Sequence, residues 1–190
     1  MRIRGSQFMR AKSGVKVFAI IFVTGALFFS FNLFAGMKPS ARAQEVAAPQ
    51  AAKPKRISAA ELAKLRWIEG TWRGTGDVEK PFYERYYFED ESTLVVEGLS
   101  DETTRSVTDT TRFKLSDEAF GNLGDGSRWV ATALDDDSVT FEPVARARNT
   151  FRWQRESKDV WKAILNWPAT ADKPARQRVY LMERLPTHKH

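Results

Sequence analysis

From Thr71 onward the chain consists of short segments in which apolar and polar residues alternate, separated by turn residues roughly every ten positions. Alternation is clear in "RWVATAL", where Trp129, Ala131 and Ala133 share one face, and in "VWKAILNW", where Trp161 and Ala163 do. Such regular short strands predict an antiparallel sandwich or barrel. A barrel is favoured because closure removes exposed sheet edges.

The predicted strands cover residues 71–79, 82–89, 93–99, 104–115, 128–134, 138–144, 149–156, 160–167 and 176–185. A short helix precedes them, because Ser58 and Glu61 can form a capping box and apolar residues recur at helical spacing up to about Glu69. Gly70 ends this helix. We therefore expect a mostly β fold, a single antiparallel up-and-down barrel of about eight to ten strands with a short N-terminal helix.

The first 43 residues have the pattern of an export signal. A basic run up to Lys16 precedes the apolar run Val17–Met37, and Ala41 and Ala43 form an A-x-A site before Gln44. A retained membrane anchor is the alternative, since the apolar run matches the ~20 residues that cross a bilayer. Both interpretations predict an exported, periplasmic domain that contacts the membrane only through this segment.

The rest of the chain is nearly neutral. Residues 1–43 hold seven of the 30 Lys and Arg and no Asp or Glu, which leaves 23 cations against 24 anions. This balance gives no reason to expect nucleic-acid binding. Residues 44–57 are rich in Ala, Pro and Lys and are predicted to be a flexible linker, and residues 58–187 the barrel domain. The chain has no cysteine, so its core must hold without disulfides.

The segment that joins helix and strands carries a family resemblance. Gly70, Thr71 and Trp72 follow the helix directly and begin the β pattern, and "YLMERLP" ends it. This arrangement resembles the lipocalin or calycin superfamily, whose first strand has a G-x-W signature. "LRWIEGTWRGTG" and "PFYERYYFED" are most similar to bacterial lipocalin-like domains of unknown function, and more distantly to nitrobindin-type haem barrels. The resemblance implies that Arg184 of the last strand lies over Trp72 and helps to close the barrel.

The resemblance to haem barrels does not extend to their iron ligand. Nitrobindins hold haem iron through a His on a late strand, and "RQRVYLMERL" has none, because the only histidines are His188 and His190. Tyr180 could ligate iron, but a packing role is favoured. We predict no haem, no other cofactor and no metal. Without Cys or a barrel His there is also no basis for a Ser-His pair or a zinc cluster.

"PFYERYYFED" leaves open which of its two faces lines the barrel. Phe82, Glu84 and Tyr86 point one way and Tyr83, Arg85 and Tyr87 the other. An inward Glu84 or Arg85 would need a partner, either in a structural ion pair or as an anchor for a ligand's polar end. Possible partners are Glu97, Arg112, Arg152 and Arg178. The residues predicted to bind ligand are Tyr83, Arg85, Tyr87, Phe151, Trp153 and Trp161.

Three functions remain open at this point. The calycin resemblance implies a non-catalytic protein that holds a small apolar or amphipathic molecule. The alternatives are an envelope domain with a filled barrel that binds a partner, or an enzyme that uses a lumen carboxylate such as Glu84 as general acid or base. An open aromatic lumen favours the first, and a solid interior favours the second. A desolvated carboxylate without a cationic partner favours the third.

Overall fold

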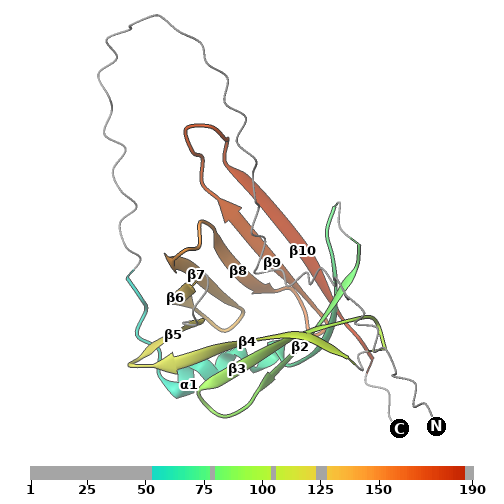
Figure 1. Ribbon diagram of the computed structural model, residues 1–190. Helices are drawn as coiled ribbons and strands as arrows, with labels where there is room; N and C mark the ends of the chain where they lie inside the picture. The colour runs from blue at the N-terminus through green and yellow to red at the C-terminus, as the bar shows by residue number, and fades with distance from the viewer. Residues whose placement is uncertain (1–52, 78–79, 104–105, 123–127, 187–190) are drawn as a thin grey trace, which may run out of the picture.

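The computed structural model describes residues 53–77, 80–103, 106–122 and 128–186 (Figure 1). The predicted export signal and most of the predicted linker lie outside these residues. Within the described part, no helix has the length and apolar character needed to cross a membrane.

Ten antiparallel strands form one closed barrel (Figure 1). Each strand pairs with its neighbours in sequence, and β1 pairs with β10 to close the sheet. This confirms the predicted mostly β, up-and-down barrel. The strands are β1 (Gly70–Thr75), β2 (Phe82–Phe88), β3 (Thr93–Leu99), β4 (Val107–Ser116), β5 (Ala119–Asn122), β6 (Arg128–Leu134), β7 (Ser138–Ala145), β8 (Thr150–Arg155), β9 (Val160–Trp167) and β10 (Arg176–Arg184).

The sequence pattern missed β5, because the turn before it has unusual residues. Strands β4 and β5 are joined by Asp117 and Glu118, whose φ angles are 50° and 62°. A two-residue hairpin with two positive φ angles normally uses Asn or Gly. Asp-Glu therefore gave no turn signal, and the short strand Ala119–Asn122 was not predicted.

The helical segment before the barrel begins as predicted and changes type after one turn. Helix α1 (Ala59–Leu62) continues as the 3₁₀ helix η1 (Ala63–Ile68). The capping box is confirmed, because the Glu61 backbone N–H donates to the Ser58 hydroxyl at 3.2 Å and the Ser58 N–H donates to the Glu61 carboxylate at 3.0 Å. This box fixes the point at which the chain turns under the barrel.

Residues 55–68 cover one end of the barrel, which we call the closed end. The apolar side chains that face it, all at most 1% exposed, are Ile57, Leu62, Leu65 and Ile68. Backbone N–H groups of Lys55 and Ile57 donate to the carbonyls of Ala131 and Glu118 at 3.0 and 2.8 Å. Residues 55–57, expected in the flexible linker, are thus fixed against the barrel by hydrogen bonds and by burial of Ile57.

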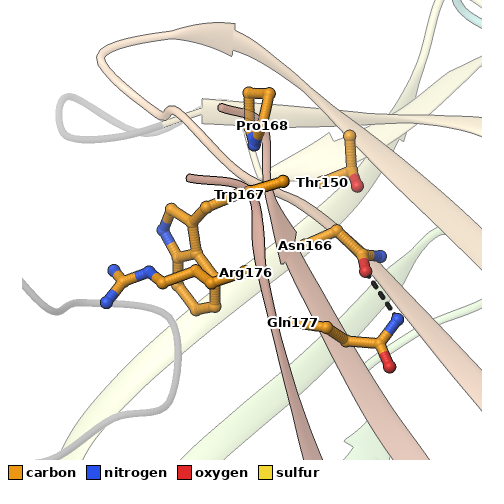
Figure 2. A pocket seen from close by; sticks show the side chains of 7 residues that line it. Thr150, Asn166, Trp167, Pro168, Arg176 and Gln177 are labelled. Carbon is orange, nitrogen blue, oxygen red and sulfur yellow. Dashed lines mark hydrogen bonds between the residues drawn. The ribbon is translucent and has the colours of Figure 1, made fainter. Parts of the chain in front are cut away.

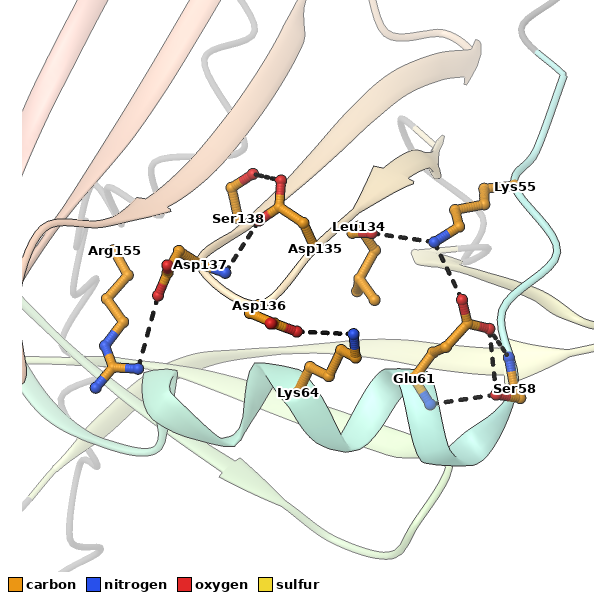
Figure 3. Close-up of polar contacts among 10 residues, drawn as sticks. All are labelled: Lys55, Ser58, Glu61, Lys64, Leu134, Asp135, Asp136, Asp137, Ser138 and Arg155. Carbon is orange, nitrogen blue, oxygen red and sulfur yellow. Dashed lines mark hydrogen bonds and ion pairs between the residues drawn. The ribbon is translucent and has the colours of Figure 1, made fainter.

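Charged side chains reinforce this contact (Figure 3). Lys64 forms an ion pair with Asp136 at 2.7 Å, and Lys55 donates to the Leu134 carbonyl at 3.0 Å. Asp135 accepts hydrogen bonds within its own turn, from the Asp137 N–H and the Ser138 hydroxyl. Asp137 pairs with Arg155 at 3.7 Å, so all three carboxylates of the turn 135–137 have defined partners.

Candidate functional site

The G-x-W segment and Arg184 meet at the closed end. The Arg184 guanidinium carbon lies 4.0 Å from the centroid of the Trp72 ring, and the Trp72 indole N–H donates to the Ile68 carbonyl at 2.7 Å. Arg184 also donates to the carbonyls of Glu69 and Trp67, at 2.7 and 3.1 Å. These contacts tie the first strand, the last strand and the helical segment together, so Trp72 and Arg184 occupy structural positions.

Gly70 is required at this place for two reasons. Its φ of 134° is a conformation that side chains rarely adopt, and a Cβ here would collide with the Arg184 guanidinium. The first residue of the G-x-W segment thus makes room for the arginine that covers its tryptophan.

The six residues predicted to bind ligand fall into two groups. Phe151, Trp153 and Trp161 point into the barrel and are at most 4% exposed. The other three, Tyr83, Arg85 and Tyr87, alternate with the buried side chains of β2 and lie on the outer face. The structure therefore does not bring the two groups together, and the face of β2 that lines the lumen is the one with Glu84.

Two of these three outward residues, Arg85 and Tyr87, make polar contacts on the outer surface. Arg85 forms an ion pair with Glu97 at 3.0 Å, and the Tyr87 hydroxyl donates to the same carboxylate at 3.2 Å. Of the partners proposed from sequence, Glu97 thus serves Arg85. Arg112 pairs with Glu89 instead, at 3.0 Å. The ion pair was expected for a charge that faces the lumen, whereas the Arg85–Glu97 pair lies on the outer face of β2.

Aromatic rings from nearly opposite walls meet in the middle of the barrel. Tyr86 on β2 lies 5.7 Å from Trp153 on β8, and Phe113 on β4 lies 5.2 Å from the same ring, centroid to centroid. Phe141 and Phe151 stack at 4.5 Å. Because β8 is four places from both β2 and β4 in the barrel, the two contacts of Trp153 span the lumen. The central part of the interior is therefore filled by rings.

Charged side chains on the inner wall gather toward the opposite end, which we call the open end. Glu84, Asp109 and Arg178 are each the third residue of a strand that begins there, and each has the inward parity of its strand. Phe82 and Tyr180 lie beside them, with ring centroids 5.4 Å apart at a near-perpendicular angle. The inner wall thus changes from aromatic in the centre to charged near the open end.

Glu84 and Asp109 face each other across a glycine. Gly98 on β3 pairs with Glu84 on one side and with Asp109 on the other. The Asp109 carboxylate leans into the space that a Gly98 side chain would fill. Asp109 therefore extends toward Glu84 over the intervening strand.

The two carboxylates have different surroundings. Glu84 is 4% exposed and accepts a hydrogen bond from the Tyr86 hydroxyl at 2.6 Å. Burial, followed by the charge and the hydrogen bond of Glu84, raises the pKa of the Tyr86 phenol well above its ordinary value. Burial also raises the pKa of the Asp109 carboxyl, opposed by a hydrogen bond from Thr108. On β10, two places from β2 in the barrel, Arg178 donates to the Tyr180 hydroxyl at 3.1 Å.

Asp109 was not identified from the sequence, although a signal existed. It shares the strand face of Thr111 and the fully buried Phe113, and a carboxylate on an apolar strand face is unusual. The predicted strand 104–115 contains Asp109, and β4 spans Val107–Ser116.

A shallow pocket of about 480 Å³ lies where β9 ends and where β8 and β10 begin (Figure 2). Asn166 and Gln177 form an amide pair at 2.8 Å on one side of the β9–β10 hairpin. Trp167 extends from the other side, with the Arg176 guanidinium carbon 4.3 Å from its ring centroid. Because the indole and the amides point away from each other, they do not converge on one ligand.

Among the described residues, no group of three or more His, Asp and Glu side chains is close enough to hold a metal ion. Tyr180, the one haem ligand considered from sequence, packs against Phe82 and is 5% exposed.

No protein-family model and no curated protein matches the chain. Among solved structures it is similar to the β-barrel EF1p2_mFAP2b bound to DFHBI, with 13% identity, a TM-score of 0.34, and coverage of 67% of this chain and 100% of that one. It is also similar to the redesigned β-barrel b11L5F_LGL, with 14% identity, a TM-score of 0.30, and coverage of 68% and 97%. At this level of similarity, inference about function depends on the chain's own residues.

Proposed function

We propose that the barrel is a non-catalytic binding protein that takes a small amphipathic molecule at its open end. The observation that carries this proposal is the gathering of Glu84, Asp109 and Arg178 on the inner wall beside Phe82 and Tyr180. A few convergent polar groups in an aromatic setting are typical of small-molecule sites. The ring-filled centre limits the ligand to the open end.

In this proposal the apolar part of the ligand packs against Phe82 and Tyr180, and its polar part meets the charged side chains. Asp109 is available to this polar part, because it is only partly buried and extends over Gly98. Tyr83, Arg85 and Tyr87 have no role in this site. A calycin relationship agrees with this function and remains part of the proposal.

A ligand series tests the proposal. The purified chain is titrated with an alkyl amine, an alkyl carboxylate and an alkanol of equal chain length, and binding is followed by calorimetry and thermal shift. We expect saturable binding of one head-group class, weakened in Asp109→Asn and Phe82→Ala. Tyr83→Ala, the outward neighbour of Phe82, is the matched control and should bind normally. Equal binding by all four proteins would refute the site.

Cross-lumen packing supports a second candidate, an envelope domain whose filled barrel serves only as a scaffold for a partner. Native mass spectrometry of the protein purified from its source separates the two. A bound small molecule supports the binding protein, and an unmodified mass together with no binding in the ligand series supports the scaffold.

Export is a separate part of the proposal and rests on residues 1–43. N-terminal sequencing of the exported protein should begin at Gln44. A start at Met1 in the membrane fraction would instead indicate a retained anchor, with the barrel still outside the cytoplasm.

A further inference from the structure

In the barrel interior, the Tyr86 hydroxyl donates a hydrogen bond directly to a buried carboxylate. The donor and acceptor, the Tyr86 hydroxyl and Glu84 Oε2, are 2.6 Å apart, and the two residues are 3% and 4% exposed. A phenol that loses an electron becomes strongly acidic, so it is oxidised easily only where a base takes its proton at once. Glu84 is such a base.

A row of indole rings connects this pair with the edge of the barrel. Tyr86 lies 5.5 Å from Trp161, and Trp161 lies 6.3 Å from Trp67, centroid to centroid. Trp67 belongs to η1 at the closed end and is only partly buried. An electron can therefore pass from Tyr86 to the surface through rings in near contact.

The two indoles of this row differ from Tyr86 in one respect. The Nε1 atoms of Trp67 and Trp161 are buried and have no hydrogen-bond acceptor within the described part of the chain. Edge-to-face ring contacts partly compensate such N–H groups. An oxidised indole in this setting has nowhere to send its proton, so it recovers by taking an electron from its neighbour.

We propose that the barrel core is a proton-coupled redox relay in which Tyr86 is the final electron donor and Glu84 the proton acceptor. A one-electron oxidant at the surface, such as an oxidising radical, removes an electron from Trp67. Trp161 then reduces the oxidised Trp67, and Tyr86 reduces the oxidised Trp161. The Tyr86 O–H bond breaks as its electron leaves, and the proton moves along the hydrogen bond to Glu84. The products are a neutral tyrosyl radical, a neutral Glu84 carboxylic acid and the reduced oxidant.

This activity differs from ligand binding at the open end, although Glu84 belongs to both. It would allow the chain, which has no cysteine, to hold one oxidising equivalent in its interior until a reductant such as a thiol returns the electron. Tyr87 offers a matched comparison. Its hydroxyl also donates to a glutamate, Glu97, but at 3.2 Å, on the outer face and away from the ring row.

The experiment is photochemical oxidation of the full chain by flash-generated tris(bipyridyl)ruthenium(III), with the radical followed by transient absorption and electron paramagnetic resonance. We expect a long-lived tyrosyl signal that forms more slowly in heavy water. Tyr86→Phe should reduce it to background and leave a short-lived tryptophan signal, whereas Tyr87→Phe should match the parent chain.

Two further variants test the proton acceptor and the entry route. Glu84→Gln keeps the volume but cannot take the proton, so tyrosyl formation should slow by about tenfold or more. Trp67→Phe should slow the arrival of the oxidising equivalent. Near-ultraviolet circular dichroism checks that each variant keeps its packed core. A tyrosyl signal of parent yield in Tyr86→Phe, or of parent rate in Glu84→Gln, would overturn the relay.

Discussion

Removal of the Trp72 ring should destabilise the closed end of the barrel. Trp72 is 1% exposed, and a Trp side chain buries ~200 Å². At ~25 cal/mol per Å² its transfer free energy is about 5 kcal/mol, an upper value because the unfolded chain is partly compact. Trp72→Ala also leaves the Ile68 carbonyl without its donor. We expect the free energy of unfolding to fall by ~3 to 5 kcal/mol.

Arg184→Ala should cost less, about 2 kcal/mol, because its hydrogen bonds to the Glu69 and Trp67 carbonyls are partly exposed to water. The contact between the Arg184 guanidinium and the Trp72 ring should couple the two residues energetically. In a double-mutant cycle measured by urea unfolding, the two losses should be non-additive by at least ~0.5 kcal/mol. Arg184→Lys is the control, since it keeps the charge and loses the planar fork.

Two results would refute this reasoning. Additivity of Trp72→Ala and Arg184→Ala would mean that the 4.0 Å contact carries no interaction energy. A loss below ~1 kcal/mol for Trp72→Ala would mean that the closed end is not held by this ring.

Three other outcomes are expected. Gly70→Ala should lower the free energy of unfolding by ~1 to 3 kcal/mol, because the positive φ is strained for Ala and the new Cβ displaces the Arg184 guanidinium; a neutral result in urea unfolding would contradict both causes. The raised pKa of Asp109 means that the folded state binds its proton more tightly than the unfolded chain does. The contribution of this raised pKa to the free energy of unfolding is therefore present at low pH and is lost as pH rises above the ordinary Asp value of about 4. Asp109→Asn should remove this pH dependence in urea titrations. Ferric haem at stoichiometric concentration should show no Soret shift, and a saturable shift abolished by Tyr180→Phe would show that haem does bind.

The strand pattern predicted most of the fold because one face of most strands packs into a ring-filled interior. β9 and β8 alternate strictly between buried and partly exposed residues, so their inward rings were identifiable from sequence. β5 was missed because its turn lacks Gly and Asn, and α1 was expected to continue as one helix. Local sequence rules do not include the change to 3₁₀ geometry that brings Ile68 under Trp72.

The orientation of β2 was not predictable, because the outer faces of β2 and β3 are also partly apolar. Tyr87 pairs with Val95 and Tyr83 with Leu99. These outward tyrosines cover outward aliphatic side chains, and Val95 is completely buried as a result. Both faces of β2 therefore contain aromatic residues, and periodicity does not distinguish them. Only the register with β1, which pairs Glu84 with Trp72, assigns Glu84 to the interior.

The two ends of the barrel differ in how much of their chemistry a sequence can reveal. The closed end is built from residues close together in the chain, Gly70, Trp72 and the preceding helical segment, with one distant addition, Arg184. The open end depends on residues of β2, β3, β4 and β10 that meet only when the barrel closes. Asp109 reaches toward Glu84 because the residue between them is Gly98, and that relation exists only in the register of three strands. Packing positions can thus be found by pattern, whereas the charged site requires the fold.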